Sequence, residues 1–268
     1  MLLKLSIVAG VVFIPFAIAI VAFVRWGVGW GATPAERSMQ MPGDDFFADR
    51  APTFVVMTRA VTIAAPPEIV WPWLTQLGRG AGWCSYDLLD NGGLMSARHI
   101  VSWVPPIQLG DASPIGYVRH HVGGSELTWW VPGTRFPAAN ARVTVDIALD
   151  PEKEGSRLVV RISADATGTM ARPVLWVFMF IDSIMAIRQL HGIKERVEAH
   201  GARSANPERP ETGARDQYQL YEVIYASGRR AGAPDKEAAE KWHRAAIAAG
   251  IIDQPQYRSE SATDARTD

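Results

Sequence analysis

Two aspartates stand next to aromatic residues in a segment that could form part of a pocket. Asp87 and Asp90 follow Trp83 and Tyr86 in the glycine-punctuated run GRGAGWCSYDLLDNGG. Neighbouring carboxyl groups beside aromatic rings could act as a general acid and base on a bound molecule. Aspartates also cap helices and form turns, which is the simpler interpretation of this pair.

Asp182 is a third carboxylate of interest because it interrupts the apolar run VLWVFMFIDSIMAI. An unpaired charge in such surroundings would be costly. We expect an ion pair with Arg119 or Arg161, which both lie in predicted strands. The alternative is a polar contact with the head group of a ligand.

Several other kinds of site lack their residues. LGRGAGW does not suit a dinucleotide, because a predicted helix rather than a strand precedes it. His120 and His121 are adjacent on a predicted strand and point to opposite faces, so they cannot hold one metal ion together. Cys84 is the only cysteine, and the net charge of −1 leaves no basic footprint for nucleic acid. The sequence therefore predicts no metal site, no cofactor and no nucleic-acid partner.

The elements that would position these residues are mostly strands with one apolar face. ARVTVDIALD places Val143, Val145, Ile147 and Leu149 on one side, and SRLVVRISADA repeats this with Leu158, Val160 and Ile162. Such alternation is typical of antiparallel strands with one buried face. A strand is also expected over 53–65, and YVRHHV and ELTWWVP flank a Gly-Gly hairpin turn.

Two helices complete the predicted domain. One is expected over 68–77, with a kink or break at Pro72, and a long one over 172–200. The apolar first half of the long helix is too short to cross a membrane and is interpreted as a core helix. This order of elements predicts an α+β fold in which a curved antiparallel sheet grips the long helix. Phe178, Ile181 and Met185 are then expected to face the inward side of the sheet across a cavity.

The first residues predict a membrane anchor. The run LSIVAGVVFIPFAIAIVAFV (5–24) carries no charge, and twenty helical residues span roughly 30 Å, the thickness of the bilayer core. We therefore expect residues 1–30 to form a single transmembrane helix and 31–52 a linker. A cleaved signal peptide is the alternative, but the run is longer than usual and no clear cleavage site follows it. Flanking charges leave the side of the soluble domain undecided.

The C-terminal part is expected to lie outside the main domain. Residues 201–213 (including SANPERPETG) suit a linker, 214–252 suit a helical hairpin, and 253–268 have the polarity of a disordered tail. The hairpin could dock on the domain or on a protein partner.

The segment from Ala60 to Asn91 resembles a known superfamily. AVTIAAPPEIVWPWLTQLGRGAGWCSYDLLDN is similar to the opening of SRPBCC proteins, the START/Bet v 1-like helix-grip superfamily often labelled polyketide cyclase/dehydrase-like. Their pattern is a strand, A-P-x-E-V-W-x-W-L-x-Q-x-G and then a G-W-Y-S-Y-D-like segment; Cys84 stands here where tyrosine is usual. The resemblance covers about residues 53–200. It implies a helix-grip fold that binds lipids, sterols, polyketides or other apolar molecules, with a few members acting as cyclases or aromatases.

Together these features predict a single-pass membrane protein whose domain (53–200) binds or transports a small hydrophobic ligand, lipid or polyketide-like. A cyclase-like enzyme acting on such a molecule is one alternative, and an interaction protein using the C-terminal helices is another. The expected partners are the membrane and the hydrophobic molecule. The residues expected to contact the ligand are Trp71, Trp83, Tyr86, Trp103, Trp130, Val145, Ile147, Val160, Phe178, Asp182 and Met185. Because Trp129 and Trp130 are adjacent on a strand, at most one of them can point to the concave face.

Overall fold

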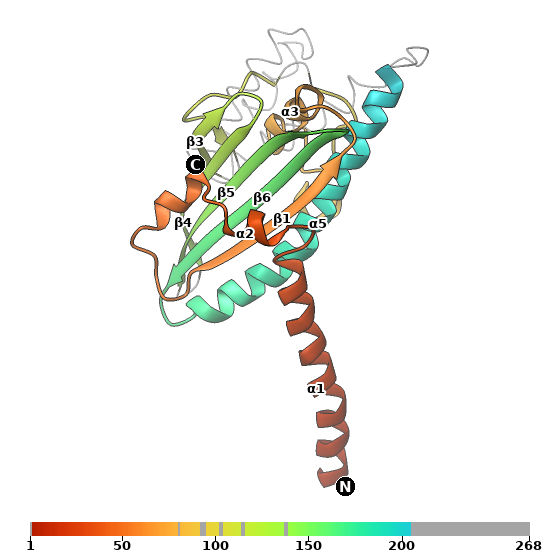
Figure 1. The fold of residues 1–268 in the computed structure, drawn as a ribbon. Coiled ribbons are helices and arrows are strands. Elements are labelled where there is room, and N and C mark those ends of the chain that lie inside the picture. Colours follow the sequence, from red (N-terminus) through yellow and green to blue (C-terminus); the bar gives the residue numbers. More distant parts are fainter. Residues whose placement is uncertain are drawn as a thin grey trace, which may run out of the picture.

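The strands form one antiparallel sheet in the order β1-β6-β5-β4-β3-β2 (Figure 1). The computed structural model describes residues 2–79, 81–91, 95–101, 104–113, 116–136 and 139–204. Five strands are long, and β2 has only two residues. The strands are β1 (Val55–Ile63), β2 (Ala112–Ser113), β3 (Gly116–Val122), β4 (Glu126–Phe136), β5 (Ala139–Glu152) and β6 (Gly155–Thr167).

The helices surround this sheet and extend beyond it. They are α1 (Leu2–Gly27), α2 (Pro34–Ser38), the 3-10 helix η1 (Pro42–Phe47), α3 (Pro67–Thr75), α4 (Asp87–Asp90) and α5 (Ala171–Ser204). Pro72 lies inside α3, which continues through it as one helix, so of the predicted kink or break the break does not occur. The chain therefore has the predicted α+β arrangement, with α5 crossing the curved sheet. Trp103, the predicted hairpin (214–252) and the predicted tail (253–268) lie outside the described residues, as does the predicted linker beyond Ser204.

The concave face of the sheet carries the core, and the residues that the alternating pattern predicts to face inward meet across the strands. Val145 pairs with Ile162, Ile147 with Val160, and Leu149 with Leu158. Ile147, Leu149, Leu158 and Val160 belong to one buried cluster with residues of α3 and α5, and Val145 packs against it. Burying each such apolar side chain stabilises the fold by about 1.5–3 kcal/mol.

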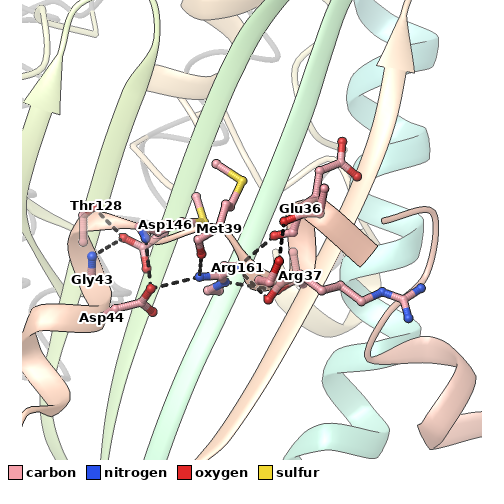
Figure 2. A network of polar contacts seen from close by, with 12 residues as sticks. Glu36, Arg37, Met39, Gly43, Asp44, Thr128, Asp146 and Arg161 are labelled. Carbon is pink, nitrogen blue, oxygen red and sulfur yellow. Dashed lines mark hydrogen bonds and ion pairs between the residues drawn. The ribbon is translucent and has the colours of Figure 1, made fainter. Parts of the chain in front are cut away.

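The convex face is covered by residues 32–52, which the composition alone indicated as a linker. Met41 packs in a small apolar cluster with Ala60, Ala148 and Val159. Polar contacts reinforce this cover (Figure 2). Arg161 donates to the backbone oxygens of Glu36, Arg37 and Met39 and to the Asp44 carboxylate. The segment is therefore held against the back of the sheet, on the side away from the core.

Asp146 is a buried carboxylate under this cover. Its carboxylate accepts hydrogen bonds from the Gly43 N–H and the Thr128 hydroxyl (Figure 2). Burial nevertheless raises its pKa to about 6, because these two bonds only partly compensate for lost hydration. At Gly43 a side chain would collide with this carboxylate, so the close approach requires glycine.

The C-terminal end of α1 is joined firmly to the domain. Val24 and Gly27 are buried, and the Val28 and Trp30 carbonyls accept hydrogen bonds from Thr58 and Ala60 at the free edge of β1. Trp30 also packs against the His191 ring of α5. The part of α1 on the N-terminal side of this joint projects away from the domain (Figure 1).

Candidate functional site

A cavity of about 490 Å³ lies between the concave face of the sheet and α5. Drug-sized ligands in proteins occupy pockets of about 300–1,000 Å³. The walls come from the end of α3, the following loop, α4, strands β4–β6 and α5 between Val174 and Ile193. The lining is mainly aliphatic and aromatic, and its polar side chains are Ser85, Asp90, Asp182 and Gln189.

The loop after α3 places Trp83 in the wall of the cavity. Gly78 has φ +64°, and a Cβ there would overlap the Trp83 ring. Glycine is therefore needed both for the left-handed backbone and for the packing of the indole. The Gln189 amide donates to the Trp83 carbonyl at 3.0 Å, which ties the loop to α5. At Gly192 of α5 a Cβ would overlap the Cys84 carbonyl oxygen, so the same loop lies directly against the helix.

Asp182 lies at the cavity wall and pairs with Arg59 of β1, with Nη1 and Oδ2 2.7 Å apart. Arg59 is 1% exposed, and its Nε and Nη2 donate to the Gly27 carbonyl and the Ser183 hydroxyl. One guanidinium thus joins the end of α1 to two adjacent residues of α5. Burial raises the pKa of Asp182, and the attraction to Arg59 opposes this.

The predicted partners of Asp182 were therefore wrong. Arg161 lies on the convex face, because it alternates with Val160 and Ile162, which face inward. Arg119 is exposed on β3. Arg59 shares the inward parity of Met57, Val61 and Ile63, and this parity is the sequence signal that could have identified it.

Asp90 is the other carboxylate at the cavity. Its Oδ1 is buried and, within the described chain, has no hydrogen-bond partner. Burial and the neighbouring Asp87 charge raise its pKa to about 6, while a hydrogen bond from Ser85 lowers it. The Ser85 hydroxyl also donates to the Met185 carbonyl of α5 at 2.9 Å. A carboxyl group in this position can present either a charged acceptor or a neutral donor to a bound molecule near neutral pH.

We expect binding of a neutral apolar probe such as Nile red to strengthen as the pH falls from about 7.5 to about 5. Asp90 has a raised pKa, so protonation through about 6 removes its charge from the cavity wall. Fluorescence titration should show this rise in the wild type and none in Asp90→Asn. Asp87→Asn serves as the matched control: it should keep the rise but move its midpoint to lower pH. An unchanged pH profile in Asp90→Asn would contradict this role.

Most of the predicted ligand-contacting residues lie together in the wall of this cavity. Those that line it are Trp83, Val145, Ile147, Val160, Phe178, Asp182 and Met185. Ile181, also expected to face inward, is 53% exposed, because it lies on the outer side of α5.

Three of the predicted aromatic residues do not line the cavity. Trp130 lies on the convex side and stacks on Phe46 at 4.9 Å between ring centroids. Trp71 stacks on His121 beside the core. Tyr86 is 42% exposed. Trp129 lines the cavity instead of Trp130, because its strand position matches Leu127 and Val131, which pair with the inward residues Ile147 and Val143.

The comparisons with known proteins give likenesses of structure only. No family model matches the chain, and no curated protein matches it. A protein of Nitrosomonas europaea matches at 14% identity and a TM-score of 0.39, over 57% of this chain and 99% of its own. An AHSA1-like protein of Rhizobium etli matches at 16% and 0.30, over 54% of this chain and 82% of its own.

The di-domain ARO/CYC StfQ of the steffimycin biosynthetic pathway matches at 10% identity and a TM-score of 0.35. The match covers 60% of this chain and 55% of StfQ. These values establish neither the family nor the activity of the chain. Its own sheet and helix have the α+β arrangement that the sequence predicts.

Proposed function

We propose that this chain is a membrane-anchored protein that holds a small apolar molecule, of lipid or polyketide size, between its sheet and α5. The observation that carries the proposal is the cavity of about 490 Å³ with a mainly apolar lining. Transfer of apolar surface out of water supplies roughly 25 cal/mol for each Å² buried. A ligand that fills such a space would gain its affinity chiefly from this term, while a few polar groups would fix its orientation.

Binding is better supported than catalysis by the polar groups of the wall. Acid–base catalysis needs groups that converge on one reacting atom. Asp182 is engaged by Arg59, and the Gln189 amide by the Trp83 carbonyl. The observation that favours a cyclase-like enzyme as the second candidate is Asp90, whose Oδ1 has no hydrogen-bond partner among the described residues and whose pKa is raised to about 6. That activity would have to disappear in Asp90→Asn while ligand binding persisted.

The anchor in this proposal is α1. Between residues 14 and 22 its described side chains are mostly exposed and all apolar, including Ile14, Phe16 and Ile18. A bare apolar helix of this kind is stable in a bilayer, where every backbone hydrogen bond is satisfied within the helix. The rigid joint at Gly27–Trp30 would then hold the cavity close to the membrane surface.

Membrane fractionation tests the anchor. We expect the full chain to remain in the membrane pellet after carbonate extraction, and a variant lacking residues 2–22 to be released. This deletion keeps Val24, Gly27 and Trp30, which pack on the domain, so the fold should survive. Release of the full chain by carbonate would contradict the proposal.

A displacement assay tests the cavity. The probe is Nile red, and the competitors are single-chain and two-chain lipids and a neutral polycyclic polyketide. We expect at least one class to displace the probe from the folded protein.

The interaction role of the C-terminal residues stays a prediction, since these residues lie outside the described part of the chain.

A further inference from the structure

The first half of α5 is apolar on both sides, and only one side faces the cavity. Leu175, Phe178 and Met185 line the cavity. On the opposite side Trp176 is 42% exposed, Val177 58% and Ile181 53%. A helix that merely closes a soluble core would carry polar residues on this outer side.

This outer side also lacks charge. Between Arg172 and Arg188 the only charged residue is Asp182, and it is turned inward to Arg59. The helix from 171 to 200 is long and apolar enough, by composition, to cross a membrane, although the sheet covers one side of it. The uncharged outer side therefore requires an apolar covering of its own.

The position of α1 indicates what covers the outer side of α5. The Phe23 ring of α1 meets the Phe180 ring of α5 edge-on at 5.7 Å between centroids. A Cβ at Gly27 would lie 2.7 Å from the Ser183 Cβ, so the two helices approach closely at this point. Figure 1 shows the first half of α5 lying across the end of the domain from which α1 projects. The exposed apolar surface of α1 thus continues onto the outer side of α5.

The residue types at this junction suit a membrane interface. Trp26 of α1 is 55% exposed and lies next to Arg25, and Trp176 of α5 lies one turn beyond Arg172. Tryptophan and arginine are enriched where the hydrocarbon meets the head groups. An interfacial helix buries its apolar side in the acyl chains, and in α5 the sheet and cavity occupy the side that faces away from the proposed membrane.

We propose that the lipid bilayer covers the outer face of α5, formed by Trp176, Val177, Ile181 and neighbouring apolar residues. The helix that walls the cavity is then itself immersed in the membrane interface, and the apolar ligand exchanges with the bilayer beside it. This inference rests on the proposed anchoring by α1 and adds a second lipid contact at a different helix.

Three variants of the full chain in liposomes, each with one added cysteine for labelling, test the inference. Val177→Cys reports the outer face of α5, Phe16→Cys reports the anchor, and Val122→Cys is an exposed control at the end of β3. Each is labelled with the environment-sensitive fluorophore NBD. Cys84 gives little background, because it is 2% exposed and burial raises its pKa to about 11.

We expect the labels at positions 16 and 177 to emit at shorter wavelength and to be quenched by lipids that carry spin labels on their acyl chains. The control label at position 122 should stay water-like and unquenched. Water-like emission at 177 with quenching at 16 would overturn the α5 inference and leave the anchor standing. Absence of quenching at both would overturn the anchor as well. A blue-shifted label at 177 that lipid spin labels do not quench would mean that protein covers the face, either a second copy or the C-terminal residues of the same chain, and would also overturn the inference.

Discussion

Replacing Arg59 by methionine is expected to lower the free energy of unfolding by about 3–5 kcal/mol at neutral pH, the usual loss when one partner of a buried ion pair is removed. The methionine would leave Asp182 without its counter-charge at a nearly closed site. It would also remove the hydrogen bonds to the Gly27 carbonyl and the Ser183 hydroxyl, so the joint between α1 and α5 should loosen. Chemical denaturation of the detergent-solubilised full chain measures the change.

The pH dependence gives this prediction a sharp control. Without Arg59, Asp182 would have a folded-state pKa above its unfolded value. The loss of free energy of unfolding that its charge causes is therefore present above that pKa and fades as the pH is lowered through it. The double variant Arg59→Met, Asp182→Asn should therefore recover part of the stability at neutral pH and show little of this pH dependence. Arg188→Met breaks an exposed pair with Glu195 and should cost less than about 1 kcal/mol. A loss at Arg59 as small as at Arg188 would contradict the structural role given to the pair.

The sheet and its inward face were predictable from the sequence, because apolar residues at every second position indicate both a strand and the face that it buries. Val145, Ile147, Val160 and Ile162 recur at every second position of their strands, which predicts that they share one face, and the structure pairs them across β5 and β6. The long helix was equally predictable from its apolar first half and its amphipathic second half. Six of the seven predicted ligand-contacting residues that line the cavity lie on these strands and this helix, and the seventh, Trp83, lies in the loop after α3.

The remaining site residues depend on contacts that no local pattern contains. Arg59 and Asp182 are separated by 123 positions and meet only because α5 crosses β1. Trp130 looked as apolar as Trp129, and a second apolar covering from residues 42–47 accommodates it on the convex face. The Gly- and Pro-rich sequence around Met41 predicted a linker. The contacts that hold it on the sheet come from Arg161 and Asp146, which are distant in the sequence.

Filling the cavity is expected to abolish ligand binding without loss of stability. Ala141 of β5 and Ala186 of α5 line opposite walls, so Ala141→Leu and Ala186→Leu together would place two branched side chains in the space that a ligand needs. We expect affinity for Nile red to fall by more than about tenfold, equivalent to 1.4 kcal/mol. The free energy of unfolding should hold or rise, since filling an existing void adds packing contacts.

The matched control for this variant is Ala199→Leu. It makes the same substitution on α5, at a half-buried position outside the cavity. Probe affinity should remain at the wild-type value there. If the control weakened binding as much as the two cavity substitutions, the probe would be reporting general changes of the protein rather than occupancy of the cavity.

The most direct measurement of the central claim is native mass spectrometry of the full chain, purified from its membranes in detergent and released from the micelle in the gas phase. We expect a population of the protein that carries one apolar molecule of lipid or polyketide mass. This population should be absent from the variant with Ala141→Leu and Ala186→Leu and present in Ala199→Leu. The bare protein mass in wild type and variants alike, with no molecule taken up from added lipids or polyketides, would contradict it.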